Sequence, residues 1–322
     1  MKIVVLERNS VGTDVSVDGL LRFGDVDFYP YTIGEDEVRE RVRDADIIIA
    51  NKAGLNERTL SGASKVRLIN EFATGYDNID LEYCKSRNIA VTNVVNYSTD
   101  AVTQHTFALA LYVLEKLRHY DEYVKDGSYA AQSGFSNYDL PFTELAGKNW
   151  GIVGMGHIGR KVAAVAQAFG CRVLHYAVSG NRTADLPDGV EEVDLDTLLR
   201  ESDLLSLHCP LSERSRGLIN YEALSKMKPS AILINVARGP VVVDADLARA
   251  LEEGLIAGAG LDVTGTEPMK NENPLSRLKD SNRLIITPHM AWASTEARHR
   301  VVDESIKNIE AFLNGGKRNR II

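Results

Sequence analysis

The chain has 322 residues and a mass of 35.4 kDa, which is long for one hydrophobic core and predicts two domains. Its hydrophobic fraction of 44% and charged fraction of 25% are those of an ordinary globular protein. The net charge of −8 argues against a broad surface for nucleic acid or for anionic membranes. No targeting or membrane-spanning segment is visible. The 3 scattered cysteines fit a reducing cytoplasm and predict no metal site.

The first hundred residues alternate short apolar, β-branched runs with amphipathic stretches, which is typical of an α/β domain with a parallel sheet. Helices are predicted over Glu35–Asp44 and Leu81–Arg87. This block contains no glycine fingerprint, so it is not predicted to hold a nucleotide. Its predicted strands are Lys2–Leu6, Val26–Tyr29, Asp46–Ala50, Val66–Phe72 and Ile89–Thr92.

A single long amphipathic helix is predicted over Thr99–Lys125. The following loop, Gly127–Pro141, is rich in small and aromatic residues, which suggests a cover for an active site or a contact with a partner subunit. A second α/β run begins at Asn149. Its later strands are predicted at Arg172–Tyr176, Leu204–His208, Ala231–Val236, Ile256–Asp262 and Arg283–Thr287.

The helix predicted at about Ser294–Asn314 has no further strand to feed. We therefore expect it to return to the first domain. The predicted division is a discontinuous domain of residues 1–98 plus 293–322 and an inserted domain of residues 99–292.

The inserted domain opens with the most informative motif, in which Gly154, Gly156 and Gly159 follow an apolar strand and start a helix with His157 and Ile158. Gly-x-Gly-x-x-Gly between a strand and a helix is typical of a dinucleotide pyrophosphate site. The glycines permit the tight turn and the close approach of backbone to phosphate, and the helix N-terminus favours the anion. The motif predicts NAD or NADP as cofactor.

Three polar residues lie just past predicted strand ends of the same domain, namely Arg238, Glu267 and His289. Open α/β sheets bind ligands at this edge. An arginine can hold a carboxylate through two bonds, and a histidine beside a carboxylate can act as acid and base. Each residue alone is more often a surface ion pair or a packed loop residue, but together they predict hydride transfer to a 2-oxo acid.

The sequence is less informative about the residues near the ribose 2′ position, which distinguish NAD from NADP. NAD-selective sites place an acid at the end of the second strand, and here that position is Ala177. Ser179, Asn181 and Arg182 follow it and could donate hydrogen bonds to a 2′-phosphate. NADP, or use of both cofactors, therefore stays open.

The chain resembles the D-specific 2-hydroxyacid dehydrogenases over nearly its whole length. The matching segments are Phe72–Leu81, Ser98–Leu109, Glu144–Arg160, Ser206–Leu211, Ile234–Leu247, Ala259–Pro268 and Thr287–Ser294. The resemblance implies two Rossmann-like domains, a flavodoxin-like substrate domain and an inserted NAD(P)-binding domain, with the active site in the cleft and a homodimer as the assembly.

The same resemblance implies Arg238 as carboxylate binder, His289 as acid and base, and Glu267 as its partner. The backbone at Ala73, Thr74 and Gly75 is expected to meet the substrate carboxylate. Residues implied to border the cofactor are His208, Cys209, Pro210, Val236, Ala237 and Asp262.

The segments Ala50–Leu55 and His289–Ser294 resemble the glycerate dehydrogenase and hydroxypyruvate reductase branch. Lys52 could pair with a polar group of the substrate, and Trp292 could limit its size, although a solvated lysine and a packed tryptophan are equal alternatives. Hydroxypyruvate or glyoxylate is therefore the expected substrate class. Larger aromatic acids such as phenylpyruvate, a phosphite or formate dehydrogenase, and a nucleotide-sensing corepressor remain alternatives.

Overall fold

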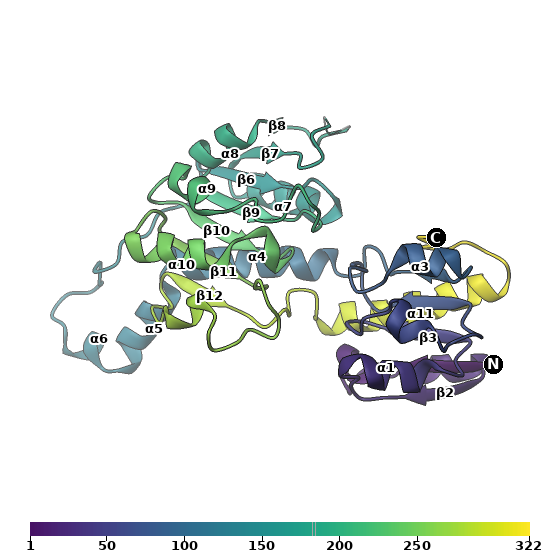
Figure 1. Cartoon of the computed structure of the whole chain (residues 1–322). Helices are drawn as coiled ribbons and strands as arrows, with labels where there is room; N and C mark the ends of the chain where they lie inside the picture. The colour runs from purple at the N-terminus through teal and green to yellow at the C-terminus, as the bar shows by residue number, and fades with distance from the viewer. Residues whose placement is uncertain (182, 184) are drawn as a thin grey trace. The chain divides into compact units, whose positions relative to one another are not determined.

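The computed structural model describes residues 1–181, 183 and 185–322. They form two compact units, one of Met1–Ser98 with Ala293–Ile322 and the other of Thr99–Trp292. Each unit is a parallel β-sheet flanked by helices, as Figure 1 shows, so the predicted α/β fold with two parallel sheets is confirmed. The substrate-binding role expected for the first unit stays a prediction.

The first unit has a five-stranded parallel sheet in the order β2-β1-β3-β4-β5, which is the flavodoxin-like order. All of its strands lie at or within a few residues of the predicted positions, because each is a short β-branched run bounded by turn residues. The strands are β1 (Lys2–Val5), β2 (Asp25–Phe28), β3 (Ile47–Ala50), β4 (Leu68–Glu71) and β5 (Ala90–Thr92).

Apolar residues of α1 (Gly34–Val42), α2 (Glu57–Leu60) and α3 (Leu81–Ser86) pack with alternate residues of these strands in one core. The C-terminal helix α11 (Thr295–Leu313) packs against β4. Its buried Asn308 donates to Asn70 Oδ1 at 3.2 Å and to the carbonyl of Asn93 at 2.8 Å. The helix that follows the last strand thus returns to the first sheet.

The second unit has a seven-stranded parallel sheet in the order β12-β11-β10-β9-β6-β7-β8. Counted from β6, this is the Rossmann order with one added strand at the β12 edge. The short edge strand β8 was not predicted from the sequence. The strands are β6 (Asn149–Val153), β7 (Arg172–Tyr176), β8 (Val190–Glu192), β9 (Leu204–Leu207), β10 (Ile232–Asn235), β11 (Gly258–Leu261) and β12 (Leu284–Ile286).

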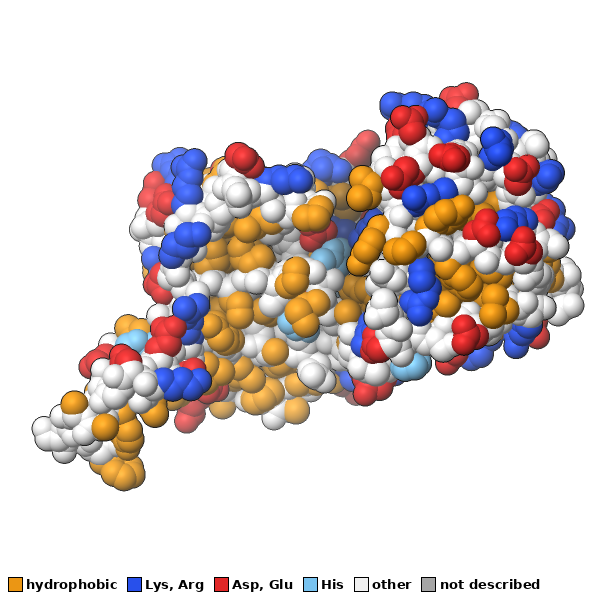
Figure 2. Space-filling model, turned by 90° about the horizontal axis from the view of Figure 1, so that it is seen from below, with side chains coloured by type: hydrophobic (Ala, Val, Ile, Leu, Met, Phe, Trp, Pro, Cys, Tyr) orange, Lys and Arg blue, Asp and Glu red, His pale blue; other side chains and the backbone are white. Residues whose placement is uncertain are grey.

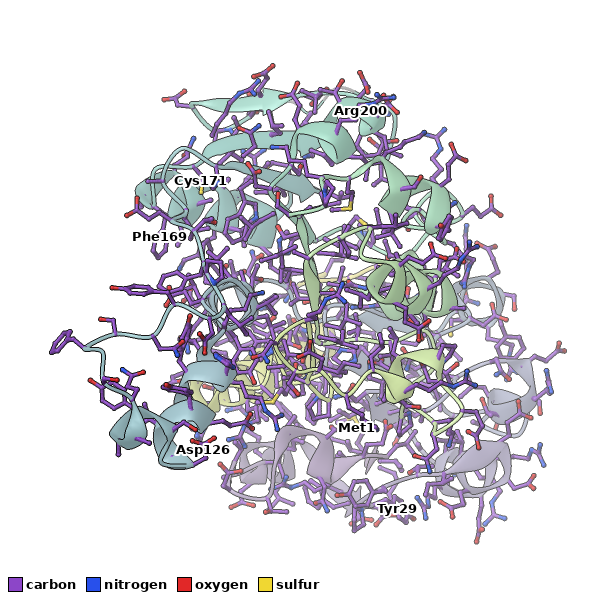
Figure 3. All side chains as sticks on the ribbon, turned by 90° about the vertical axis from the view of Figure 1, so that its left-hand side faces the viewer. Met1, Tyr29, Asp126, Phe169, Cys171 and Arg200 are labelled. Atoms are coloured by element: carbon purple, nitrogen blue, oxygen red, sulfur yellow. The ribbon has the colours of Figure 1, made fainter. Side chains whose placement is uncertain are left out.

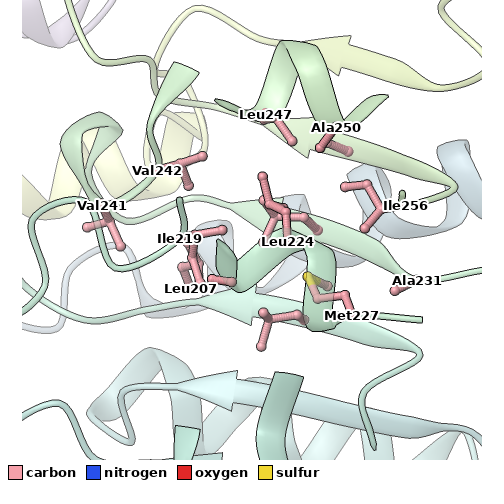
Figure 4. Packing of buried hydrophobic residues seen from close by; sticks show 14 of the residues in the cluster. Leu207, Ile219, Leu224, Met227, Ala231, Val241, Val242, Leu247, Ala250 and Ile256 are labelled. Atoms are coloured by element: carbon pink, nitrogen blue, oxygen red, sulfur yellow. The ribbon is translucent and has the colours of Figure 1, made fainter. Parts of the chain in front are cut away.

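Helices cover both faces of this sheet. One face packs with α4 (Thr99–Leu114) and α7 (His157–Ala168). The other packs with α8 (Leu195–Glu201), α9 (Tyr221–Lys226) and α10 (Asp244–Glu253). Figure 4 shows part of this core, including Leu224 of α9 and Leu247 and Ala250 of α10. Short 3₁₀ helices are formed by Arg8–Val11, Asp18–Phe23, Gly239–Val241 and Pro274–Arg277.

The prediction of one long helix over Thr99–Lys125 is wrong, because α4 ends at Leu114. Lys116 adopts a left-handed conformation with φ of 55°, and a second helix, α5 (Leu117–Lys125), starts there. A short α6 (Ser128–Ala131) follows, and neither α5 nor α6 buries a residue. Within the second unit this part of the chain lies to one side of the sheet, marked by Asp126 in Figure 3.

Candidate active site

The carboxyl ends of β10, β11 and β12 lie side by side at one edge of the second sheet, since the three strands are parallel neighbours. The loop after each strand carries one of the predicted catalytic residues. Arg238 follows β10, Glu267 follows β11 and His289 follows β12. Parallel pairing therefore gathers residues that are up to 51 positions apart in sequence, which is how open α/β sheets build ligand sites.

His289 and Glu267 form a direct pair. The imidazole Nδ1 lies 2.9 Å from Glu267 Oε2. The side chains are 24% and 34% exposed, so the pair is open to a small molecule without being fully solvated. The carboxylate accepts from Nδ1–H, so Nε2 is the ring nitrogen outside this pair.

The backbone at His289 is held in an unusual conformation, with φ of 54° in a residue that carries a β-carbon. Its N–H lies 2.8 Å from the carbonyl oxygen of Asp262 and 3.0 Å from that of Thr287. These contacts over-determine the turn, as expected for a strained residue at a functional site.

The carboxylate of Asp262 organises the loop around His289. It accepts hydrogen bonds from Thr287 Oγ1 at 2.5 Å and from the backbone N–H groups of Met290 and Ala291 at 2.8 Å each. The side chain is only 1% exposed. The family resemblance implied that Asp262 borders the cofactor. In the structure its carboxylate accepts hydrogen bonds from the loop that carries His289.

His105 is a member of this network that the sequence reasoning missed. It projects from α4, and its Nε2 lies 2.9 Å from Thr287 Oγ1 and 3.6 Å from Asp262 Oδ1. Burial lowers the pKa of His105, and the charge of Asp262 opposes that shift. The available signal was a histidine within a helix whose other inward residues are mostly apolar.

The turn that carries Arg238 fits closely against the loop that carries Glu267. A β-carbon placed on Gly239 would lie 1.7 Å from the carbonyl oxygen of Thr264, so only glycine fits. The buried Asn235 shapes the turn, because its side chain accepts from Ala237 N at 3.0 Å and donates to the Arg238 carbonyl at 3.1 Å. Arg238 Nη1 donates to the carbonyl of Ala237 at 2.9 Å.

A cavity of about 790 Å³ opens beside the glycine turn of the same unit. Seven of the predicted cofactor residues line it, namely Gly154, Gly156, Ala177, Ser179, His208, Cys209 and Pro210. The sequence reasoning did not assign the remaining lining residues, which are Met155, His175, Val178, Thr183, Ser212, Glu213 and Arg214.

The glycine turn fits a dinucleotide. Gly154 has φ of 94°, and a β-carbon there would lie 2.9 Å from the backbone of His208 and Cys209. A β-carbon on Gly159 would lie 2.1 Å from the Gly154 carbonyl oxygen. Gly156 caps α7, and a β-carbon built on it would meet no atom within 4 Å, so the space over the turn is open. The first N–H groups of α7 remain available to an anion.

His208 presents a polar atom that fits the same ligand. Its Nε2 lies 3.0 Å from Ser206 Oγ, while its Nδ1 is buried and has no hydrogen-bond partner among the described residues. Burial lowers the pKa of His208 to about 3, so the ring is neutral. A buried polar nitrogen on a cavity wall is costly unless a bound molecule satisfies it.

The other predicted cofactor residues that the structure describes are not among those that line this cavity. His157, Ile158 and Gly159 form the first turn of α7. Val236 and Ala237 follow the carboxyl end of β10. Arg182 lies outside the described residues.

The predicted substrate residues are divided between the units. Lys52 lies past β3, where its N–H and that of Asn51 donate to the Glu7 carboxylate at 3.0 and 2.7 Å. Ala73, Thr74 and Gly75 follow β4, and Thr74 is held by bonds to Val94 and Asn93. Trp292 lies in the second unit and is partly buried. Their roles toward a substrate stay predictions.

Comparison with known proteins agrees with this geometry. Residues 107–291 match the sequence model described as D-isomer specific 2-hydroxyacid dehydrogenase, NAD binding domain. The chain is 38% identical over 322 residues to a hydroxypyruvate reductase of Blautia hydrogenotrophica, covering 99% of each chain.

Two solved structures share the whole fold. One is a D-lactate dehydrogenase of Aquifex aeolicus complexed with NAD and lactic acid, with a TM-score of 0.86, 30% identity and coverage of 100% and 99%. The other is an acyclic imino acid reductase in complex with NADPH and D-Arg, with a TM-score of 0.88, 31% identity and full coverage of both chains.

The chain belongs to the D-isomer-specific 2-hydroxyacid dehydrogenase family. It is an NAD(P)-dependent oxidoreductase of that family, so the predicted enzyme class and cofactor type are confirmed. Within the described residues, no helix has the length and apolar character needed to cross a membrane. In the same part of the chain, no three His, Cys, Asp or Glu side chains are grouped to hold a metal ion.

Proposed function

We propose that this chain reduces a small 2-oxo acid, of the hydroxypyruvate or glyoxylate kind, to the D-2-hydroxy acid. The observation that carries the proposal is the 2.9 Å pair of His289 Nδ1 and Glu267 Oε2, on the sheet edge that also carries Arg238. The similarity to a hydroxypyruvate reductase over 99% of both chains supports the substrate class.

In this proposal Arg238 binds the substrate carboxylate and orients the neighbouring carbonyl, since a guanidinium presents two parallel donors to a carboxylate. When bound, the nicotinamide supplies the hydride that is transferred to C2. His289 Nε2 donates a proton to the carbonyl oxygen as the carbon is reduced. One hydride and one proton thus convert the 2-oxo acid into the 2-hydroxy acid.

Glu267 acts through His289. By accepting from Nδ1–H it fixes the ring orientation and stabilises the charged imidazole before the proton leaves. The Asp262 network holds the backbone on which the ring is carried. Because reduction consumes a proton, we expect reductive turnover to fall and oxidation of the hydroxy acid to rise with increasing pH.

We further propose a homodimer that uses the projecting segment of Leu117–Pro141. Several of its apolar side chains are strongly exposed, among them Val124 at 56%, Phe135 at 92% and Tyr138 at 81%. Figure 2 shows hydrophobic side chains on this projecting part. Such a surface is costly in water and is typical of a protein–protein contact.

The experiment that tests the function is a set of initial rates with NADH and NADPH against glyoxylate, hydroxypyruvate, pyruvate and phenylpyruvate, followed at the nicotinamide absorbance. We expect the highest kcat/KM with hydroxypyruvate or glyoxylate. Turnover of phenylpyruvate alone would keep the reaction and overturn the substrate class. Tight cofactor binding without turnover of any acid would favour a nucleotide sensor instead.

A further inference from the structure

Arg214 has no role in the reaction described above, yet it lies on the wall of the cofactor cavity. Of the residues described along that cavity, it is the one with a permanent positive charge. It belongs to the loop after β9, next to the predicted cofactor residues Cys209 and Pro210. A chemical role therefore depends on which part of the cavity the guanidinium reaches.

The guanidinium reaches the turn at the end of β7. Arg214 Nη1 donates to the carbonyl oxygen of Ser179. In the same turn Gly180 N donates to the Ala177 carbonyl at 3.0 Å. Gly180 has φ of 75°, and a β-carbon on it would lie 2.8 Å from Arg214 Nη1, so the guanidinium lies close against this turn. Arg214 thus links the loop after β9 to the turn after β7.

This turn is where a Rossmann domain distinguishes the two nicotinamide cofactors. A carboxylate at the end of the second strand binds the ribose 2′-hydroxyl and repels a 2′-phosphate. Here that end carries Ala177, which lines the cavity. Nearby carboxylates are those of Glu213, also on the cavity wall, and Glu192, which accepts from Thr183 N at 2.8 Å.

We propose that Arg214 binds the 2′-phosphate of NADPH and makes NADPH the preferred cofactor. One of its five N–H donors is used on the Ser179 carbonyl, and the others can be directed at phosphate oxygens. The contact with Ser179 fixes the guanidinium before the cofactor arrives, which lowers the entropy cost of binding. This inference rests on the proposed function, because NADPH would be the hydride donor of the proposed reduction.

Binding without turnover tests Arg214 directly. The probes are 2′,5′-ADP and 5′-AMP, measured by calorimetry on the wild type and on the Arg214→Ala variant. A charge-assisted contact predicts that the variant weakens 2′,5′-ADP by about 10- to 100-fold while 5′-AMP changes by less than about threefold. Arg216→Ala, an exposed arginine two positions along the same loop, is the matched control and leaves both affinities unchanged.

A second variant tests the same part of the cavity from the end of β7. Ala177→Asp introduces the carboxylate that the turn lacks, and we expect it to weaken 2′,5′-ADP and to spare or strengthen 5′-AMP. Equal loss of both probes in Arg214→Ala, or no loss of either, would overturn the proposal. So would a wild-type preference for 5′-AMP, or a selective loss in Arg182→Ala with none in Arg214→Ala.

These outcomes are separable from those for the proposed function. If no 2-oxo acid is reduced but 2′,5′-ADP binding depends on Arg214, the cofactor assignment stands and the substrate assignment fails. If hydroxypyruvate is reduced equally well with both cofactors in the wild type and in Arg214→Ala, the function stands and the cofactor assignment fails.

Discussion

Nδ1 of His289 lies 2.9 Å from Oε2 of Glu267, although the two residues are carried by loops after different strands. The distance is that of a charge-assisted hydrogen bond. Two further contacts hold the loops of this site. The Asp262 carboxylate accepts hydrogen bonds from the loop that carries His289, and Gly239 packs closely against the Thr264 carbonyl oxygen. Each of these three features can be changed by one substitution.

Replacing His289 by Ala removes the proposed proton donor. We expect kcat for reduction to fall by about 10²–10⁴-fold, with a small change in the KM of the cofactor. Glu267→Gln keeps the hydrogen-bonding shape but loses the charge, and we expect a smaller fall in kcat of about 10- to 100-fold. His299→Ala, at an exposed position on α11, is the control. Loss of less than tenfold in His289→Ala would assign the residue a structural role.

Asp262→Asn places an amide where the loop offers N–H donors. The buried side chain then presents an NH₂ group toward at least one donor, which costs about 1–3 kcal/mol of stability. We expect a lower melting temperature, lower kcat and faster hydrogen exchange at Met290 and Ala291. Asp303→Asn, at an exposed position on α11, should change none of these. Normal exchange in a variant with lost activity would point instead to direct contact of Asp262 with ligand.

Gly239→Ala tests the fit between the Arg238 turn and the Glu267 loop. The added methyl group would lie 1.7 Å from a backbone oxygen, so one of the two loops has to move. We expect kcat/KM to fall at least about 100-fold, because a misplacement of about 1 Å is enough for that loss. Gly62→Ala is the matched control, since a β-carbon there meets nothing within 4 Å. Equal behaviour of the two variants would rule out the steric argument.

His208 makes stability depend on pH in a defined direction. Its pKa is lowered from 6.5 to about 3 by burial in the folded chain. The unfolded chain therefore binds a proton that the folded chain does not, and stability present above pH 6.5 is lost as pH falls. At pH 5 the loss is about 2 kcal/mol by linkage. Urea unfolding without cofactor should show that His208→Asn lacks this part of the acid sensitivity, and parallel curves would contradict it.

The projecting segment is tested by the double variant Phe135→Ser, Tyr138→Ser. Both side chains are more than 80% exposed, so their removal does not disturb the core of the unit. We expect sedimentation to show a dimer for the wild type and a shift toward monomer for the variant. Leu21→Ser, at a position 51% exposed in the first unit, should leave the assembly unchanged. A monomeric wild type would contradict the proposed dimer.

Much of the fold was predictable because its signals are local. The strands other than the short edge strand β8 are short apolar runs, and the glycine turn joins one of them directly to a helix, so sequence alone places these strands within a few residues. The end of α4 was not predictable in this way. The apolar spacing continues past Lys116, but nothing local shows that this lysine takes a left-handed conformation.

The site residues likewise include some that local sequence signals predict and some that they do not. Arg238, Glu267 and His289 each follow a predicted strand, and parallel pairing brings strand ends together. His105 and Arg214 lie in a helix and in a loop, and their roles depend on contacts with Thr287 and Ser179 that only the folded chain provides. Residues that act through tertiary contacts leave no periodic trace in the sequence.

The return of α11 to the first sheet has a consequence for synthesis of the chain. Asn70 and Asn93 emerge from the ribosome early, but their hydrogen-bond partner Asn308 is translated only after the whole second unit. The second unit is continuous and can fold as soon as it is made, whereas the first lacks the helix that packs on β4 until the end of the chain is made. The amino-terminal unit, although made first, is thus the last to be completed.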